Sequence, residues 1–295
     1  MAQTSSLEAF RAKHGQLAYN ALMKASGQMG GKTKPISTNS GLSQAARNIM
    51  NPLNQAVQNS AGKKIARVRG SADVPLTDEG AAQADERGQQ FSARGGLDQL
   101  VTSPLQRARN TAVAISRYGG TPIHVDDRAM PWKLGIFEGE PVDDVKHMIG
   151  KLAVDHPNDK IPGRSAYSTA DGESFNDFTK RFLGGLMAPL MEAHAQDPRG
   201  KIGVVSHLRD VLAAKSWINN GARRDLQFDH HDINYETMTS AEDKPASVHR
   251  IYPDGDKWKM EDEDMEDQKP LLPGIYMIRH GKTAWNADPN TGETS

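Results

Sequence analysis

Three short apolar runs, each ending in polar residues, constrain the fold of this 295-residue chain more than any other feature. LDQLVTS (97–103) and KIGVVSH (201–207) each precede a helical pattern, and GIYMIRH (274–280) lies between Pro273-Gly274 and Gly281. Strands that alternate with helices predict an α/β fold, with a mainly parallel sheet covered by helices on both faces. Because ligands bind beyond the carboxyl ends of parallel strands, we expect the polar residues at these three ends to converge.

The composition excludes several classes of protein. The chain has no cysteine, so disulfides, thiolate zinc sites and cysteine nucleophiles are ruled out, and any metal would be held by histidines and carboxylates. No stretch approaches the roughly 18 consecutive apolar residues of a membrane-spanning helix, and the opening MAQTSSLEAF lacks the apolar core of a secretory signal. We therefore expect a cytoplasmic protein without a membrane partner, acting alone or within a larger particle.

Charge divides the chain unevenly. Residues 1–64 carry eight Lys or Arg against one acid, a net +7, while the remainder carries −8. Helical apolar spacing within 4–28 and 42–57 predicts helices too short to bury much alone. We expect residues 1–62 to be a basic helical extension and 63–295 to be the main domain, in which the acidic stretch at about 254–272 is a solvated linker.

The run MIRHGKTAWN (277–286) carries the clearest chemistry. A predicted strand delivers Arg279 and His280 to a glycine turn. A neutral imidazole can attack phosphorus directly, and an adjacent guanidinium can hold phosphoryl oxygens in a bidentate manner. This pattern indicates a phosphoryl-transfer site.

Five further segments strengthen this interpretation. They are RVRGSADVPLTDEGAAQA (67–84), VTSPLQRARNTA (101–112), LGIFEGEP (134–141), DGESFNDF (171–178) and VVSHLRD (204–210). Together with the 277–286 run they resemble the histidine phosphatase superfamily, the phosphoglycerate mutase-like proteins, over nearly all of residues 64–295. The resemblance implies a three-layer α/β/α fold, a small phosphorylated substrate, and chemistry that needs no metal or cofactor.

The order of these motifs differs from that of the family. In the family, the strand that bears RHG opens the domain, whereas here RHG lies near the C-terminus and GSADVPLTDEG lies near the start of the domain. Joining the end of the chain to the segment that begins at Ala61 would restore the usual order. We therefore expect a circular permutant in which the acidic stretch connects the family's last strand to its first. Placement of 274–280 at a sheet edge far from 201–207 would contradict this hypothesis.

The resemblance assigns roles residue by residue. His280 becomes the nucleophile, Arg279 and Arg107 clamp the phosphoryl group, and His207 is the second pocket histidine. Thr283 and Asn286 match family positions near the phosphate, and Arg69-Gly70 matches a turn that faces the substrate. By its own chemistry, Thr77 is better explained as a helix cap than as a ligand.

One departure from the family puts the general acid in doubt. Many relatives carry a glutamate four residues before the glycine that corresponds to Gly135, and Pro131 stands there. We consider Glu138, Glu173 and Asp210 as substitutes and narrowly favour Glu138, for which a structural role is equally open. Leu208 replaces a usual glycine after the second histidine.

Two functions of different classes fit these observations. The first is a metal-independent phosphatase that hydrolyses a small phosphomonoester through a phosphohistidine, with a mutase as the less favoured variant because of Pro131. The second is a structural or interaction module of a large assembly, such as a viral one, on a degenerate phosphatase fold, with residues 1–62 docking onto a partner protein.

The basic extension shows no nucleic-acid-binding motif, so a solvated basic face is the preferred explanation of its charge. Lys133 and Arg209 could contact an acidic part of the substrate, and the oligomeric state is not predicted.

Overall fold

The computed structural model describes residues 66–163, 165, 171–222, 233–235, 238 and 243–286. The predicted extension 1–62 and its boundary lie outside these residues. The chain divides into two compact units: the first takes its described residues from 66–72, 133–175 and 285–286, and the second from 73–132 and 176–284. No helix among the described residues is long and apolar enough to cross a membrane.

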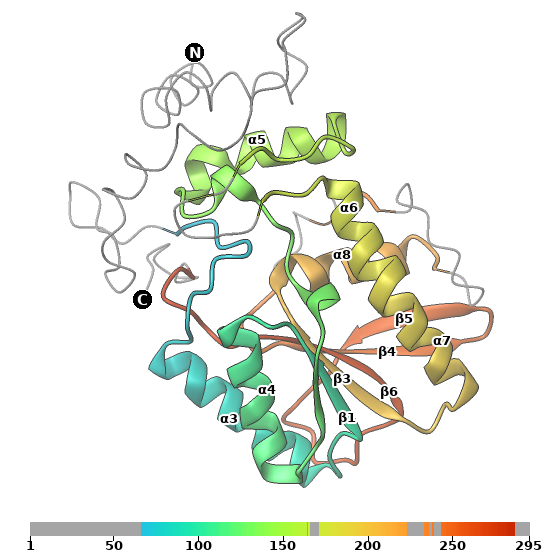
Figure 1. The fold of residues 1–295 in the computed structure, drawn as a ribbon. Coiled ribbons are helices and arrows are strands. Elements are labelled where there is room, and N and C mark those ends of the chain that lie inside the picture. Colours follow the sequence, from blue (N-terminus) through green and yellow to red (C-terminus); the bar gives the residue numbers. More distant parts are fainter. Residues whose placement is uncertain are drawn as a thin grey trace, which may run out of the picture. The chain divides into compact units, whose positions relative to one another are not determined.

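The second unit is built on one six-stranded sheet with the order β2-β1-β3-β6-β4-β5. Its strands are β1 (Gln99–Thr102), β2 (Ile123–Val125), β3 (Lys201–Ser206), β4 (Val248–Asp254), β5 (Lys257–Asp262) and β6 (Gly274–Arg279). The first four strands in the sheet are parallel, and β4 and β5 continue it in antiparallel fashion. The three predicted strands are therefore β1, β3 and β6, and they are neighbours with one common direction (Figure 1).

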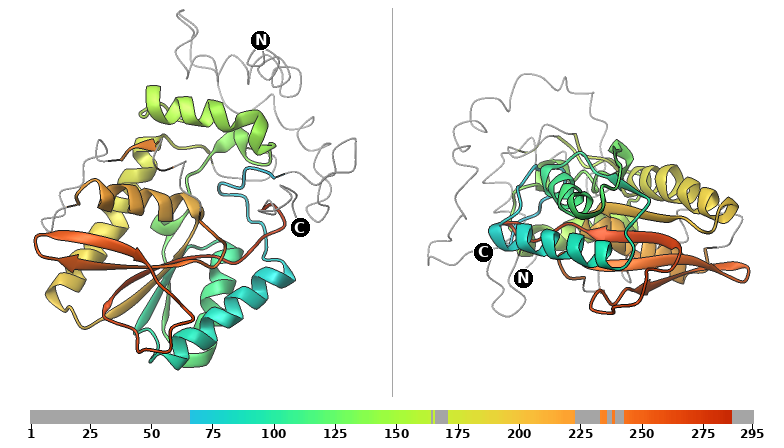
Figure 2. Two further views of the ribbon diagram at one scale, coloured as in Figure 1. Left: turned by 180° about the vertical axis from the view of Figure 1, so that it is seen from behind. Right: turned by 90° about the horizontal axis from the view of Figure 1, so that it is seen from below.

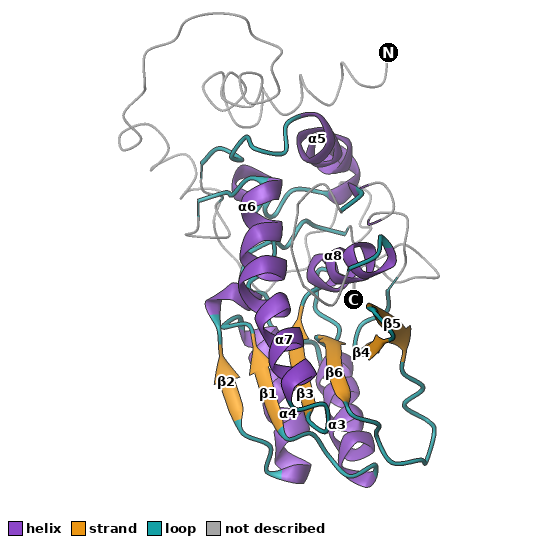
Figure 3. Cartoon of the chain, turned by 90° about the vertical axis from the view of Figure 1, so that its right-hand side faces the viewer, coloured by secondary structure: helices purple, strands orange, loops and turns teal. Residues whose placement is uncertain are grey.

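Helices cover both faces of this sheet, as an α/β fold requires (Figure 3). One layer holds α3 (Asp78–Ala93) and α4 (Gln106–Gly119), and the other holds α6 (Phe175–Thr179), π-helical η3 (Lys180–Met187), α7 (Ala188–Gln196) and α8 (Leu208–Asn219). A single turn of 3₁₀ helix, η1 (Asp127–Ala129), follows β2. The three-layer α/β/α prediction is confirmed.

Local signals explain where these helices begin and end. The side chain of Thr77 accepts a hydrogen bond from the Gly80 amide at the start of α3, which is the cap expected from the sequence. Gly120 ends α4 in the left-handed conformation. The central strand β6 is buried along its whole length, and its Tyr276 ring packs edge-on against Phe91 of α3. Apolar burial therefore fixes the strand that delivers Arg279 and His280.

The acidic stretch is more ordered than a solvated linker. Residues 257–262 form β5, which pairs with β4 through a tight turn at Gly255 and Asp256, with Gly255 at φ +61°. Trp258 of β5 is buried, while its neighbours Lys257 and Lys259 face solvent. One apolar anchor and a glycine turn thus form an edge hairpin, which extends from the sheet in the rear view (Figure 2).

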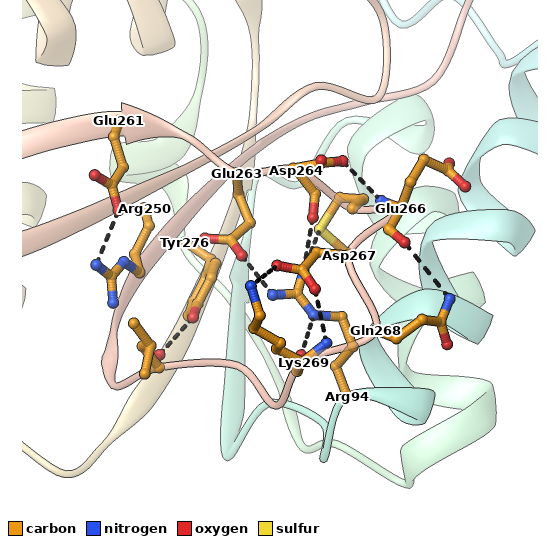
Figure 4. A network of polar contacts seen from close by, with 12 residues as sticks. Arg94, Arg250, Glu261, Glu263, Asp264, Glu266, Asp267, Gln268, Lys269 and Tyr276 are labelled. Carbon is orange, nitrogen blue, oxygen red and sulfur yellow. Dashed lines mark hydrogen bonds and ion pairs between the residues drawn. The ribbon is translucent and has the colours of Figure 1, made fainter.

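Arg94 anchors the rest of this stretch, between β5 and β6. Its guanidinium donates to the Lys269 carbonyl (2.7 Å), the Asp264 carbonyl (3.0 Å) and the Glu263 carboxylate (2.7 Å), as Figure 4 shows. Met265 and Leu271 of the same stretch belong to the buried core cluster of the unit. The connection to β6 is therefore held by a buried cation and two apolar side chains.

The first unit is smaller and contains η2 (Gly135–Phe137) and α5 (Val142–Asp155). Residues 66–68 run alongside 139–142, with hydrogen bonds from the Val68 amide to the Glu140 carbonyl (2.9 Å) and from the Gly139 amide to the Val68 carbonyl (2.7 Å). Apolar residues of α5, among them Val145, Ile149 and Leu152, form its buried face.

Candidate active site

The RHG turn begins where β6 ends and is held by backbone and helix contacts. The His280 amide donates to the Ser206 carbonyl at the end of β3 (3.1 Å), and the Gly281 amide donates to the Thr111 hydroxyl of α4 (3.2 Å). Thr111 in turn donates to the Arg107 carbonyl one helical turn earlier (2.8 Å). These contacts bring the ends of β3 and β6 and the first turns of α4 together, as the parallel strands predicted.

Glycines allow the N-terminus of α3 to approach this turn closely. A Cβ on Gly281 would lie 2.2 Å from the Gly80 carbonyl oxygen, and a Cβ on Gly80 would lie 2.0 Å from the Lys282 carbonyl oxygen. The Thr77 amide also donates to the Lys282 carbonyl (3.0 Å). Both positions therefore require glycine, because backbone meets backbone there.

The orientation of His280 defines its reactive nitrogen. His280 is 1% exposed, and its Nδ1 lies 2.6 Å from the Gly281 carbonyl oxygen. A carbonyl only accepts, so we assign the proton of the neutral imidazole to Nδ1. The lone pair of His280 is then at Nε2, the atom available to a nucleophilic step.

His207 lies directly beside His280. The two ring centroids are 5.2 Å apart, and the Nε of Arg107 donates to the Nδ1 of His207 (3.2 Å). Since arginine only donates, His207 accepts at Nδ1 and carries its proton at Nε2 when neutral. His207 and Arg107 are both buried, and they form one hydrogen-bonded unit across the ends of β3 and α4.

Arg279 is the second buried guanidinium of the site, with 3% of the residue exposed. Its NH1 donates to the Asp243 carbonyl, and the Asp243 carboxylate lies 3.9 Å away. Burial lowers the pKa of Arg279 to about 10, and the charge of Asp243 opposes this shift. The group therefore remains cationic at neutral pH.

Four of the predicted catalytic residues thus lie in the second unit, where His207 is hydrogen-bonded to Arg107 and its ring lies beside that of His280. Thr283, the fifth predicted residue in this unit, is buried and forms an isolated bridge with Leu76. The remaining predicted residues belong to the first unit: Arg69, Gly70, Glu138 and Asn286.

Glu138 is a buried hydrogen-bond acceptor within the first unit. Its carboxylate accepts from the Ser71 amide (2.8 Å), the Ser71 hydroxyl (2.8 and 2.9 Å) and the Leu134 amide (2.9 Å). Gly70 has φ +46°, and a Cβ there would lie 2.2 Å from Oε1 of Glu138. The carboxylate therefore ties the 69–71 turn to the start of η2, an arrangement that favours the structural role left open by the sequence.

The other candidate acids also have backbone partners. Glu173 accepts from the Lys133 amide (3.1 Å) in the first unit. Asp210 is fully buried in the second unit and accepts from the His207 amide (3.2 Å) in a capping box at the start of α8. Asp210 is thus the one candidate that shares a unit with His280. The Pro131 carbonyl accepts from Arg181 (3.2 Å).

Arg209, two residues after His207, is held over an aromatic ring. Its guanidinium carbon lies 5.6 Å from the centroid of Trp132, and its NH1 donates to the Tyr235 hydroxyl (3.2 Å).

Sequence reasoning missed Thr111 and Asp243. Thr111 could have been found from its position four residues after Arg107 on one helix face, whereas the segment around Asp243 carries no motif.

Among the residues that the structure describes, no cluster of three or more His, Asp or Glu side chains has the arrangement of a metal site. The donors gathered at the ends of β3, β6 and α4 are instead imidazoles and guanidiniums. Such donors suit an anionic group, and they lie at the carboxyl edge of a parallel sheet, where the α/β class of proteins binds its ligands.

Comparison with known proteins identifies the family within this class. The chain belongs to the histidine phosphatase superfamily (branch 1), whose family model matches residues 58–262. It is 29% identical over 155 residues to an uncharacterised phosphatase, PhoE, of Bacillus subtilis, covering 52% of this chain and 70% of that protein. It is 30% identical over 128 residues to a probable phosphoglycerate mutase, GpmB, of Cronobacter sakazakii, covering 42% of this chain and 55% of that protein.

Among solved structures, the α-ribazole phosphatase of Shigella flexneri matches with a TM-score of 0.47 and 19% identity, covering 70% of this chain and 91% of that chain. The chain spans little more than half the length of the GpmB proteins that it matches.

Proposed function

We propose that this protein is a phosphatase that hydrolyses a small phosphomonoester through a phosphohistidine on His280, without a metal ion. The observation that carries the proposal is the arrangement of His280, His207 and Arg107 in one buried group at the end of a parallel sheet. Membership of the histidine phosphatase superfamily supports the same reaction class. The phosphatase and mutase names of the relatives leave the substrate open.

The reaction would proceed in two displacements. Nε2 of neutral His280 attacks phosphorus, an N–P bond forms, and the ester P–O bond breaks as the leaving alkoxide takes a proton from a general acid. Water then attacks the phosphohistidine, the N–P bond breaks, and inorganic phosphate leaves with the proton lost by water passing to a base. Arg107, Arg279 and the Nε2 proton of His207 would stabilise charge on the phosphoryl oxygens throughout.

The general acid stays a prediction. Glu138 is the candidate favoured by its place in the sequence, and Asp210 is the candidate in the same unit as His280. Separate Glu138→Gln, Glu173→Gln and Asp210→Asn variants would be compared at equal folded fraction. Loss of the acid should lower kcat by about 10²- to 10⁴-fold, and the loss should shrink for substrates with good leaving groups. A loss of thermal stability with unchanged kcat would assign a structural role.

The decisive experiment measures phosphate release from an aryl phosphate in the presence of a chelator. We expect turnover in the wild-type protein and none in His280→Ala. The matched control is His124→Ala, because His124 is an exposed residue of β2. Turnover that the chelator abolishes would contradict the metal-free mechanism, and turnover that survives in His280→Ala would contradict the phosphohistidine. An inactive wild-type protein would favour the structural module.

We also propose that the domain is circularly permuted. Three observations support this: the motif order, the match of the family model that ends before the RHG motif, and the central position of β6 next to β3. If the RHG strand had been added to the domain separately, nothing would require it to lie between β3 and β4.

Residues 1–62 are proposed to dock onto a protein partner. Their net charge of +5, against −6 for residues 63–295, supports an appended segment with its own binding role. Removal of residues 1–62 should leave aryl phosphate turnover in place and abolish association with an acidic partner. Undisturbed assembly after the deletion would contradict the docking role.

A further inference from the structure

A turn formed by residues 243–247 runs along the backbone of Arg279 and His280. The Arg279 amide donates to the Ser247 carbonyl (3.0 Å), and the Ala246 amide donates to the His280 carbonyl (3.2 Å). Within the turn, the Ser247 amide donates to the Lys244 carbonyl (3.1 Å). The turn is thus part of the frame that fixes the two residues, although none of its residues belongs to a motif of the sequence.

The turn is also conformationally costly. Ala246 has φ +58°, and no other non-glycine residue among those described has a positive φ. Pro245 precedes it, so the turn has the sequence positions of a type II turn with alanine where glycine is usual. Ala246 is 1% exposed, and its carbonyl accepts from Arg87 of α3 (2.9 Å). Surrounding contacts must therefore hold the turn in this conformation.

Asp243 begins the turn and links Arg279 to a second charged group. Besides the carbonyl that accepts from Arg279, its carboxylate accepts from the Ser247 hydroxyl (2.8 Å) and lies 2.8 Å from the Nε2 of His249. The Nδ1 of His249 lies 2.8 Å from Asp262 of β5, and Lys215 of α8 lies 3.3 Å from the same carboxylate. The side chains of Asp243 and His249 are each 5% exposed.

His249 lies between two carboxylates. Its Nε2 is 2.8 Å from an oxygen of Asp243, and its Nδ1 is 2.8 Å from an oxygen of Asp262. The contacts therefore run from Arg279 through Asp243 and His249 to Asp262 and Lys215. A buried carboxylate that is fixed on one side by Ser247 and His249 can fix a buried guanidinium on the other.

We propose that Asp243 is a positioning residue that holds Arg279 in the geometry needed to bind phosphoryl oxygens, and that His249 holds Asp243. This inference rests on the proposed function, because it takes Arg279 as a phosphoryl ligand. It adds to the site an outer layer formed by β4 and the turn before it.

A purely electrostatic role of Asp243 and a positioning role predict opposite effects of Asp243→Asn on anion binding. If Asp243 acted only through its negative charge, its neutralisation would strengthen the binding of an anion nearby. If it served folding alone, the folded fraction would fall and the affinity of the folded protein would not change. If it positions Arg279, Asp243→Asn weakens anion binding, because the guanidinium loses the charged carboxylate that lies 3.9 Å from it and keeps only its hydrogen bond to the Asp243 carbonyl.

The test measures the dissociation constant of inorganic phosphate by calorimetry on the full-length protein, in a double-mutant cycle of Asp243→Asn and Arg279→Gln. We expect Asp243→Asn to raise the dissociation constant about tenfold or more in the wild-type background. In the Arg279→Gln background we expect a change of less than about twofold, since the residue through which Asp243 acts is gone. His249→Gln should show the same pattern with a smaller effect.

The control is Asp254→Asn. Asp254 lies on β4, the strand of His249, and its exposed carboxylate pairs with Lys259 of β5, so the variant should leave the dissociation constant unchanged. Unchanged or tighter binding in Asp243→Asn, or an equal loss in both backgrounds, would overturn the inference. If Asp243→Asn does not fold, His249→Gln decides by the same criteria. Absence of phosphate binding in the wild-type protein would instead overturn the proposed function.

Discussion

The candidate active site is defined at the scale of single hydrogen bonds, since each of its two histidines has one ring nitrogen that is already hydrogen-bonded. His280 donates from Nδ1 to a carbonyl, and His207 accepts at Nδ1 from Arg107. Opposite tautomers therefore follow: His280 presents a lone pair at Nε2, and His207 presents a proton there. One ring can act as a nucleophile while its neighbour donates to a phosphoryl oxygen.

Arg107→Lys tests this arrangement. Lysine keeps the charge but lacks the Nε that donates to His207, so His207 loses the contact that fixes its tautomer. A lost hydrogen bond to a charged group is worth about 1.5–3 kcal/mol, and we expect kcat/KM for an aryl phosphate to fall by about 10- to 100-fold. Steady-state kinetics at equal folded fraction check this. Arg109→Lys, on the exposed side of α4, should remain at the wild-type rate, and equal activity of the two variants would contradict the prediction.

Sequence reasoning reached these residues because they stand in motifs. RHG, SPLQRA and VVSH each follow or begin a recognisable element, so their meeting at the sheet edge could be expected. Asp243 could not be expected, because its role depends on a turn that lies beside β6 only in three dimensions. Glu138 was found as a carboxylate near a motif, but its hydrogen bonds to Ser71 and Leu134 could not be foreseen from spacing.

At the scale of elements, the β4–β5 hairpin and the connection to β6 differ most from the sequence-based picture. The acidic composition of this stretch indicated solvation, yet the Gly-Asp pair at 255–256, which forms the two-residue loop, is a recognised hairpin signal. Alternation around Trp258 could have supported the same conclusion. The burial of Met265 and Leu271 could not, because two isolated apolar residues in an acidic run show no periodicity.

Arg94→Ala should destabilise the protein strongly. The side chains of Arg94 and Glu263 are 6% and 12% exposed, so removal of the cation leaves a buried carboxylate and two carbonyls without their donor. Breaking such a pair costs about 3–5 kcal/mol. Urea unfolding measures the loss. The control Arg117→Ala removes a guanidinium that is 64% exposed and paired with Asp85, and should cost less than about 1 kcal/mol. Similar losses in both variants would show that Arg94 does not anchor the connection.

His194 of α7 should make stability depend on pH. It is 2% exposed, its ring lies 6.3 Å from that of Trp258, and burial lowers its pKa below the usual 6.5 despite the opposing charge of Asp197. The unfolded chain therefore takes up this proton first as pH falls. The contribution of neutral His194 to the free energy of unfolding is therefore fully present above pH 6.5. It is lost as the pH falls from there through the lower pKa of the folded state.

Urea unfolding at several pH values on both sides of 6.5 checks this expectation. The wild-type protein should lose stability towards acid, and His194→Gln should lose less because glutamine takes up no proton. His124→Gln, at an exposed position of β2, should keep the wild-type dependence. The same acid-induced loss in wild type and His194→Gln would exclude His194 as its source.

At the scale of the whole molecule, the order of motifs along the chain and their order in the sheet carry different information. The parallel strands place the end of β6 beside that of β3, although 67 residues lie between the end of β3 at Ser206 and the start of β6 at Gly274.

 In space β3 and β6 are direct partners, from the pair Lys201–Gly274 to the pair Ser206–Arg279. The order of the segments along the chain is therefore a separate property from the fold that brings the site residues together.

The last prediction follows from this separation. A reordered chain that begins at Lys269, runs to Ser295, continues directly into Ala61 and ends at Gln268 would restore the motif order of the family. The cut lies between two exposed residues, and it leaves Arg94 its partners on both sides: Glu263 and Asp264 before it, and Lys269 after it. We expect the reordered protein to fold and to turn over an aryl phosphate at a rate within about threefold of that of the parent, because the contacts of β6 with β3 and β4 are unchanged.

A matched chain cut between Val204 and Val205, inside buried β3, should not fold. Circular dichroism and phosphate release compare the three proteins, and failure of the Lys269 chain to fold beside a folded, active parent would count against the permutation.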